Sequence, residues 1–302
     1  MIFFPNKNFK LTTKTAFSLI ELSVVILIIG VLVLGVTQGS RMMSEAKLKS
    51  ARSLTTSSPV ASIEGLAVWL DSTSENAFGI GTGGTYNNVS APGNGAAVGR
   101  WNDLNPTSTS KIDATQSASG NQPIYTTNAI NGLPALSFDG TSDYMVNNTL
   151  SLGSEITMFA VASANEIGWR RIINQENIYY LGTGPGTMEF ASFTGNGSSW
   201  NNTASFGSTA TLTAKKAYVL DTVVFGNTTG YVNGASVGNV SGAKVSSTSL
   251  NVGASSSHPT LGVIQFWSGN IAEIIVFNRA LNDTERKSVE SYLGQKWGIK
   301  VS

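Results

Sequence analysis

Apolar residues form one long run near the N-terminus and only short segments after it. Residues 17–36, FSLIELSVVILIIGVLVLGV, contain a single charged side chain, Glu21. A helix of this length covers about 30 Å, the thickness of the hydrocarbon core of a bilayer. Helix-forming residues continue beyond it until Ser, Thr and Pro59 stop the pattern. The pattern predicts a membrane-crossing helix over residues 17–55 and a linker over residues 56–62.

From residue 63 onward the apolar pattern is that of short strands. Asn233-Gly234 suits a type I′ hairpin turn, because such a turn needs positive φ at both positions. Strands and helices do not alternate, which argues against a parallel α/β sheet. We therefore predict a mainly β head over residues 63–302. Its strands are expected in six segments rich in β-branched and aromatic residues: 65–71, 134–140, 156–163, 217–225, 228–234 and 270–277.

The C-terminal segment returns to a helical pattern. Asn282 is followed three residues later by Glu285, the spacing of a capping box. The pattern predicts a short helix over residues 282–293. One side of this helix is expected to bury Leu281, Val289, Tyr292, Leu293 and Trp297.

Composition narrows the range of functions. The chain has 19 Lys and Arg, 18 Asp and Glu, one His and no Cys, and charged residues make up 12% of it. A near-zero net charge argues against nucleic acid as a partner. The absence of Cys excludes disulfides, Cys-ligated zinc and thiol catalysis. Low charge with abundant Gly is typical of an extracellular β protein.

The N-terminal run differs from a secretory signal and from an ordinary signal anchor. A secretory signal has a shorter apolar core and a small-residue cleavage site, and residues 36–43 offer no such site. An ordinary anchor has no reason to hold Glu21, because a carboxylate in an apolar span is costly and is usually functional. The ordinary alternative is a tolerated acid near the end of the span.

The stretch KTAFSLIELSVVILIIGVL resembles the prepilin N-terminus of type IV pilins and type II secretion pseudopilins. The matching residues are Lys14, Ala16, Phe17 and Glu21, followed by the apolar run. The resemblance implies that a prepilin peptidase removes the leader 1–16 and methylates the Phe17 amine. Most family members have Gly at the position of Ala16. The resemblance also implies that Glu21 pairs with the Phe17 amine of a neighbouring subunit.

Phrases of the head resemble the laminin-G-like and concanavalin-A-like lectin and glucanase superfamily. The resemblance implies that the head is a jelly roll of two antiparallel sheets packed face to face. The predicted fold class is therefore mainly β: the long N-terminal transmembrane helix, this β-sandwich and the short C-terminal helix. The superfamily includes sugar binders, protein binders, glucanases and spacers, so fold alone does not choose the function. The matching phrases are AVWLD (67–71), RWNDLN (100–105), residues 122–145, YVNGASVG (231–238) and residues 271–299.

Catalytic signals are weak. Glucanases of this fold carry acids at alternate positions of one strand, whereas Glu155, Glu166, Glu176 and Glu189 are at least ten residues apart. His258, the single histidine, has no nucleophile motif G-x-S-x-G with it. Gly79, Gly81 and Gly84 match G-x-G-x-x-G without a following helix, so they indicate a loop. We predict that the chain is not an enzyme.

Two sets of residues are candidates for ligand binding. Asp139 and Asp143, in FDGTSDY, are oxygen donors suited to Ca²⁺, although an Asp in a turn also caps its own backbone. Trp169 and Trp200 lie beside polar loops, where either one stacks on a sugar or caps the edge of the sandwich. The other signature tryptophans are expected in the core: Trp69, Trp101, Trp267 and Trp297.

Together these features predict a pilin-like subunit, minor or at the tip of a type IV pilus, whose lectin-like head binds a glycan or another surface ligand in adhesion. Its partners are then the prepilin peptidase and other pilin subunits. It crosses the bacterial inner membrane once, with its N-terminus inside and its head periplasmic and later extracellular. The alternative is a type II secretion pseudopilin whose head contacts cargo or sister subunits. A membrane-tethered glycan hydrolase is a third interpretation.

Overall fold

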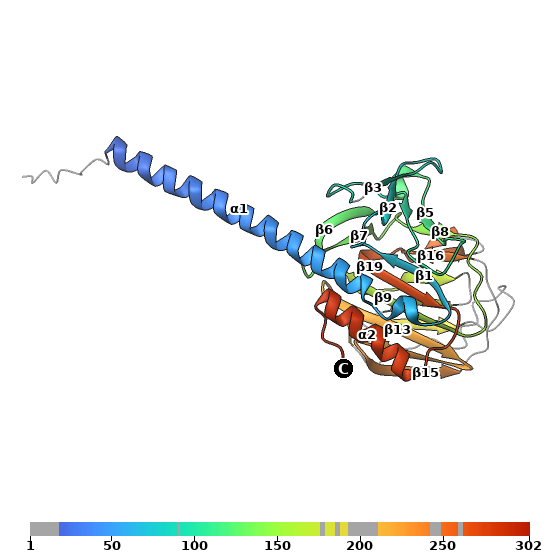
Figure 1. Cartoon of the computed structure of the whole chain (residues 1–302). Coiled ribbons are helices and arrows are strands. Elements are labelled where there is room, and N and C mark those ends of the chain that lie inside the picture. The colour runs from blue at the N-terminus through green and yellow to red at the C-terminus, as the bar shows by residue number, and fades with distance from the viewer. Residues whose placement is uncertain are drawn as a thin grey trace, which may run out of the picture. The chain divides into compact units, whose positions relative to one another are not determined.

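The computed structural model describes residues 18–89, 91–175, 179–184, 188–192, 211–241, 249–258 and 262–302. The chain divides into two compact units, residues 1–45 and 46–302. Helix α1 (Leu19–Thr56) contributes residues to both units (Figure 1). The last turns of α1 therefore belong to the same compact unit as the head. The sequence pattern had predicted that the head begins at residue 63.

The N-terminal unit is the apolar part of α1. This helix is long and apolar enough to cross a membrane, and its most apolar stretch has no buried residue in the part of the chain that is described. Its length and composition are those of a membrane anchor or of a signal sequence. Glu21 lies in the first turn, where its Oε2 accepts a hydrogen bond of 2.9 Å from the Ser18 backbone N–H. A carboxylate at this position interacts favourably with the helix dipole.

The head is built on two antiparallel sheets. In sheet A, strand β19 pairs along one edge with β9. Its other edge pairs with β7 along the first half and with β1 along the second half. Among the described residues this sheet has eight strands: β15 (Ala235–Ser241), β14 (Asn227–Val232), β13 (Ala217–Phe225), β9 (Ile156–Ala164), β19 (Ser268–Phe277), β7 (Leu133–Asp139), β6 (Ile124–Ile130) and β1 (Leu66–Asp71).

Sheet B is made of shorter strands. A separate hairpin joins β17 (Ser255–His258) to β18 (Gly262–Ile264). Nine strands of sheet B lie in the described part of the chain, in the order β12 (Met188–Ser192), β11 (Tyr179–Thr183), β10 (Arg170–Gln175), β16 (Leu250–Val252), β8 (Met145–Asn147), β5 (Ala114–Thr115), β4 (Arg100–Trp101), β2 (Phe78–Ile80) and β3 (Asn87–Val89).

The sandwich confirms the predicted fold class. All six predicted strand segments are strands of sheet A. Asn233 and Gly234 have φ of 50° and 83° and connect β14 to β15, as the hairpin signal predicted. The predicted core tryptophans have side chains no more than 4% exposed. The core between the sheets includes Phe78, Trp101, Phe138, Met158 and Trp267.

Helices cover the outer face of sheet A and form a third layer (Figure 1). The C-terminal helix α2 (Asp283–Trp297) extends beyond the predicted 282–293, and its capping box at Asn282 is present. The predicted linker contains a short 3₁₀ helix (Val60–Ser62) with Val60 fully buried; a second one spans Ser119–Asn121. The last turns of α1 join this layer, where Ala51 is 2% exposed.

A buried carboxylate, that of Glu273 on β19, joins the helical layer to sheet A. Its Oε1 accepts hydrogen bonds from Trp69 Nε1 (2.8 Å) and Tyr292 Oη (2.7 Å). Its Oε2 accepts hydrogen bonds from Lys296 Nζ and Trp297 Nε1, both at 2.8 Å. These five residues, together with Asp71, are called the Glu273 network below.

Asp71, at the end of β1, completes the Glu273 network. Its Oδ2 lies 2.8 Å from Lys296 Nζ and accepts a hydrogen bond from Thr55 Oγ1 of α1 (2.9 Å). Its Oδ1 accepts from both the backbone N–H and the hydroxyl of Thr73 (2.8 Å each). Burial alone raises the pKa of Asp71, but the Lys296 ammonium and these hydrogen bonds outweigh burial and hold the pKa below its ordinary value.

A second buried acid, Asp221 of β13, lies under α2. Fewer favourable contacts offset the cost of burying its charge than at Asp71. In the described part of the chain, neither of its carboxylate oxygens accepts a hydrogen bond, and a protonated Asp221 donates one to the Glu290 carboxylate. Burial raises the pKa of Asp221 well above its ordinary value, and the nearby Glu290 carboxylate raises it further, while Arg286 lowers it. Arg286 pairs with Glu290 and stacks on Tyr231, with its guanidinium carbon 3.7 Å from the ring centroid. The folded head therefore favours a protonated Asp221.

This geometry predicts how stability depends on pH. A carboxyl whose pKa is raised by folding contributes stability at low pH and loses that contribution as pH rises through the raised value. Asp221→Asn keeps the group neutral at every pH. It should raise the free energy of unfolding by about 2 kcal/mol at neutral and alkaline pH, with a smaller effect near pH 4. Urea unfolding of the purified chain at several pH values measures this difference.

The matched control is Asp283→Asn at the start of α2, because the side chain of Asp283 is 78% exposed. It should change the free energy of unfolding by no more than about 0.5 kcal/mol. A destabilised Asp221→Asn variant at pH 8 would contradict the assignment of a protonated Asp221.

Candidate functional site

The face of sheet B that points away from the core is the candidate binding surface. Directly opposed residues of antiparallel strands have side chains on the same face. Their chain neighbours Trp101 and Met145 are buried between the sheets, so the opposed residues face outward. The register places one row across the sheet, called the outer row: Gly79, Arg100, Thr115, Val146, Asn251, Asn174 and Tyr180. The last three of these are buried, so a ligand can reach the row at Arg100, Thr115 and Val146.

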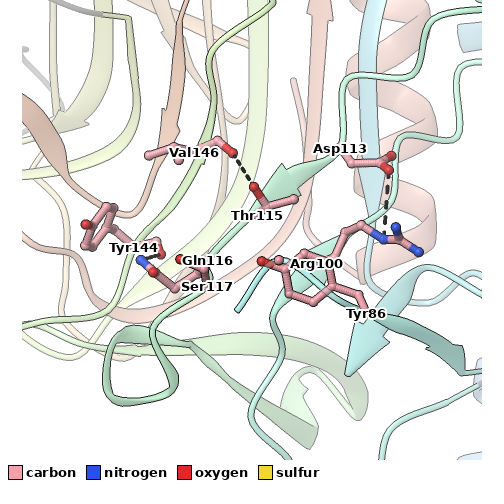
Figure 2. A pocket seen from close by; sticks show the side chains of 9 residues that line it. Tyr86, Arg100, Asp113, Thr115, Gln116, Ser117, Tyr144 and Val146 are labelled. Atoms are coloured by element: carbon pink, nitrogen blue, oxygen red, sulfur yellow. Dashed lines mark hydrogen bonds and ion pairs between the residues drawn. The ribbon is translucent and has the colours of Figure 1, made fainter. Parts of the chain in front are cut away.

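One end of the outer row is hollowed (Figure 2). The hollow has a volume of about 510 Å³, within the range of small-ligand sites. It combines two aromatic rings, one cation, one anion, hydroxyls and an amide, a set suited to a polar ligand with some apolar surface. The lining residues are Gly84, Tyr86, Arg100, Asp113, Thr115, Gln116, Ser117, Tyr144 and Val146.

Arg100 and Asp113 face each other across one side of the hollow (Figure 2). Arg100 Nε lies 3.9 Å from Asp113 Oδ2, and the two side chains are 25% and 28% exposed. Arg100 also donates from Nη2 to Asn88 Oδ1, which fixes the guanidinium on β3. Asp113 Oδ1 accepts a hydrogen bond of 2.8 Å from the Asp103 backbone N–H. The hollow therefore presents a fixed donor group and a fixed acceptor group side by side.

Tyr86 lies against two glycines, Gly79 and Gly99, which are called the glycine floor below. A Cβ at Gly99 would lie 2.5 Å from Tyr86 Cε1, and a Cβ at Gly79 would lie 2.9 Å from Tyr86 Cβ. The Arg100 guanidinium carbon is 5.6 Å from the Tyr86 ring centroid. Burial raises the pKa of Tyr86, and Arg100 opposes this only in part. Tyr86 is therefore a neutral phenol at physiological pH, with a ring able to stack and a hydroxyl able to donate.

The opposite wall is fixed by hydrogen bonds to the backbone. Gln116 donates from Nε2 to the Tyr144 carbonyl (3.0 Å), and its Oε1 accepts from the Ala118 N–H (3.0 Å). Thr115 Oγ1 donates to the Val146 carbonyl (3.2 Å). These contacts hold the wall in place without a ligand, which lowers the entropic cost of binding one.

Sequence reasoning did not single out Tyr86, Arg100 or Asp113. Arg100 lies in the phrase RWNDLN, which was used only for the fold resemblance. The loop prediction is confirmed for Gly81 and Gly84 and is wrong for Gly79, which lies in strand β2. No local pattern indicated that Gly79 contacts Tyr86 or that Gly84 lines the hollow. The one sequence feature that could have indicated this site is the presence of a Tyr and an Arg close to glycines in a chain with few charged residues.

The predicted calcium residues lie in the turn after β7. Asp139 Oδ1 accepts hydrogen bonds from the N–H groups of Thr141, Ser142 and Asp143, and its Oδ2 accepts from two hydroxyls of the same turn. Although burial opposes the change, these bonds lower the pKa of Asp139. Burial and the Asp139 charge raise the pKa of Asp143 to about 6. Asp139 thus caps its own turn, and Ca²⁺ binding stays a prediction.

None of the other predicted residues that the structure describes lines the hollow. Trp169 precedes β10 and is 49% exposed. Glu166 is paired with Arg170. Trp200 and Glu176 lie outside the described residues, as do the side chains of Glu189 and His258. In the described part of the chain, no group of three His, Asp or Glu residues is arranged to hold a metal ion.

Comparison with known proteins shows the fold and no family. No protein-family model and no curated protein sequence matches the chain. A sialidase of Trypanosoma rangeli, solved with 2,3-difluorosialic acid, is 14% identical with a TM-score of 0.50. The match covers 80% of this chain and 34% of the sialidase, so the chain spans about a third of that protein. At this identity the likeness shows a lectin-like jelly-roll sandwich and nothing about activity.

Two further likenesses are weaker. Domain 4 of an extracellular GH43 arabinanase from Geobacillus stearothermophilus, in complex with arabinotriose, is 12% identical with a TM-score of 0.46, over 75% of this chain and 97% of that domain. A heptameric SAP-like pentraxin from Limulus polyphemus is 18% identical with a TM-score of 0.40, over 50% of this chain and 78% of the pentraxin. Scores below 0.5 carry no argument.

The glycine floor leads to a prediction about packing. Gly99→Ala places a methyl group against Tyr86 and against the Gly81 carbonyl oxygen, each 2.5 Å away. The crowding should lower the free energy of unfolding by about 1–3 kcal/mol. Gly120→Ala is the matched control, because a Cβ there meets nothing within 4 Å. Urea unfolding of both variants measures the effect, and equal stabilities would contradict the packed floor.

Proposed function

We propose that the chain is a membrane-anchored, pilin-like subunit whose head binds a polysaccharide without cleaving it, at the hollow on sheet B. The observation that carries the binding part is the arrangement of Tyr86, Arg100 and Asp113 around a fixed hollow of ligand size. A sugar ring offers an apolar face to an aromatic side chain and hydroxyls to neighbouring donors and acceptors.

The composition of the hollow supports a neutral or weakly charged ligand. Arg100 and Asp113 lie close enough to offset each other's charge, so long-range attraction contributes little. Recognition then depends on stacking and on hydrogen bonds at short range. Sites of this kind are individually weak, and display of many heads on one filament would raise the overall avidity.

The hollow also supports binding without hydrolysis. Most glycoside hydrolases use two carboxylates that flank the bond to be cleaved. Asp113 is the one acid among the residues that line the described hollow. Its carboxylate accepts a backbone hydrogen bond and lies beside the Arg100 guanidinium, with no second carboxylate among the described lining residues.

The pilin assignment rests on the prepilin-like motif around Ala16 and Phe17 and on the apolar helix that follows it. Processing by a prepilin peptidase, assembly with other pilins through α1, and passage from the inner membrane to the cell surface all belong to this proposal. A secretion pseudopilin shares the same N-terminal motif.

Glycan binding is tested by two aromatic variants of the full chain in detergent micelles. Tyr86→Ala should weaken binding to the glycans that the parent protein selects on an array by about tenfold, because a stacking contact contributes on the order of 1 kcal/mol. Trp169→Ala should leave binding unchanged, because Trp169 is exposed outside the hollow. Titration with and without Ca²⁺ tests the metal prediction in the same experiment.

The reverse pattern, loss with Trp169→Ala and none with Tyr86→Ala, would move the site to the loop before β10. Absence of binding to any glycan under both conditions, or release of reducing sugar over time, would overturn the proposed function.

Processing is tested by the N-terminus of the mature protein. If a prepilin peptidase acts on the motif, sequencing should begin at methylated Phe17. Ala16→Gly, which restores the residue most common in the resembling family, should give the same start and at least as much mature protein. A mature start near residue 40 would show ordinary signal cleavage and contradict the pilin assignment.

A further inference from the structure

A lysine and two carboxylates from three elements meet in the interior of the head. Asp71 and Glu273 lie directly opposite each other in the register of β1 and β19. Lys296, in the last turn of α2, places its Nζ 2.8 Å from Asp71 Oδ2 and 2.8 Å from Glu273 Oε2. All three side chains are 0% exposed. This is the closest set of amine and carboxyl groups in the buried part of the described head.

Aromatic rings surround these groups. The Trp69 and Tyr292 rings meet edge to face at 6.4 Å, and Lys296 Nζ lies 5.3 Å from the Trp297 ring and 5.5 Å from the Tyr292 ring. Such a wall keeps bulk water away from the amine and from both carboxyl groups. Low polarity also narrows the energy gap between an ion pair and the neutral amine and acid, because it penalises separated charges.

We propose that Lys296 and Asp71 condense to an intramolecular amide, with Glu273 carrying the proton between them. This inference is independent of glycan binding and of pilin assembly.

The condensation consumes one ammonium group and one carboxylate, and it produces one amide and one water. Glu273 takes a proton from the Lys296 ammonium and passes it to Asp71 Oδ2. The lone pair of Nζ then attacks Asp71 Cγ and forms the C–N bond. A second proton leaves the nitrogen by way of Glu273, the bond from Cγ to Oδ2 breaks, and Oδ2 departs as water. The product is one amide that keeps a single N–H, and Glu273 returns to its starting state.

The surroundings of Asp71 favour this attack. Two donors of Thr73, its backbone N–H and its hydroxyl, are directed at Oδ1, the oxygen that gains negative charge when Nζ adds to Cγ. Folding already holds Nζ 2.8 Å from Oδ2 of the carboxyl group that it attacks, so most of the entropic cost of bringing the reactants together has been met. The released water departs from a site that excludes bulk water, so hydrolysis of the new amide is disfavoured.

The position of Glu273 suits a proton carrier. Burial raises its pKa above the ordinary value, more than the Lys296 ammonium lowers it, and the Asp71 carboxylate adds to the rise. Its Oε2 contacts the lysine that loses protons, while Trp69 and Tyr292 hold its Oε1 in place. A group that exchanges a proton with its neighbours at fixed geometry is an effective general acid and base.

The test is the intact mass of the purified full chain, denatured after folding. The parent protein should be lighter than its sequence by the mass of one water. Trypsin should then release a branched product that joins residues 53–100 to residues 288–300, uncleaved after Lys296. Tandem mass spectrometry should locate the branch at Asp71 and Lys296. A folded parent protein with the full sequence mass would overturn the proposal.

Three variants separate the amide from other losses of water. Lys296→Met removes the amine, and Glu273→Gln removes the proton carrier; both should retain the full mass, with circular dichroism reporting whether each folds. Tyr292→Phe, the matched control, removes one hydrogen bond to Glu273 but leaves the three reacting groups, and it should still lose one water. A mass loss that persists in Lys296→Met would indicate a cyclic imide at an aspartate and contradict the cross-link, and a cross-linked Glu273→Gln would remove the role of Glu273.

Discussion

The carboxylate of Glu273 is the group on which the architecture of the head depends. A buried carboxylate is unfavourable unless its oxygens are fully hydrogen-bonded, and Glu273 receives its four hydrogen bonds from side chains of β1 and α2. Trp69 and Glu273 are 204 positions apart in the chain. The first strand and the last helix must therefore both dock before this acid is satisfied, which makes the helical layer and sheet A one cooperative structure.

The helices occupy the outer face of sheet A. On the outer face of sheet B, Asn174, Asn251 and Tyr180 are buried as well, so the end of the outer row near Arg100 is the part open to a ligand. The outer row shows how the sheet prepares that surface. Its register brings Arg100 and Thr115 side by side from strands of two residues each, and glycines beneath Tyr86 let an aromatic ring lie close to the backbone. Arg100 and Asp113 supply a hydrogen-bond donor and an acceptor at defined positions in the hollow. Because their opposite charges lie close together, their electrostatic potentials nearly cancel at longer range.

The sequence predicted local structure well and tertiary proximity poorly. The apolar run, the strands of sheet A, the Asn233-Gly234 turn and the capping box are local patterns, and the structure contains each of them. The short strands of sheet B and the hollow are different. Tyr86 directly precedes β3 and Asp113 directly precedes β5, so they meet Arg100 of β4 only through the pairing of β3, β2, β4 and β5. Trp69 and Trp297 were predicted as core residues, and their role as N–H donors to Glu273 has no signature in local sequence.

Helix α1 combines two kinds of stabilisation in one element. Its first part satisfies its backbone within the helix and exposes apolar side chains, as lipid requires. Its last turns depend instead on the head: Ala51 is buried and Thr55 hydrogen-bonds to Asp71. Among the described strands, β1 pairs with β19 alone. The contacts of Asp71 with Thr55 of α1 and Lys296 of α2 therefore add attachments that β1 lacks along its other edge.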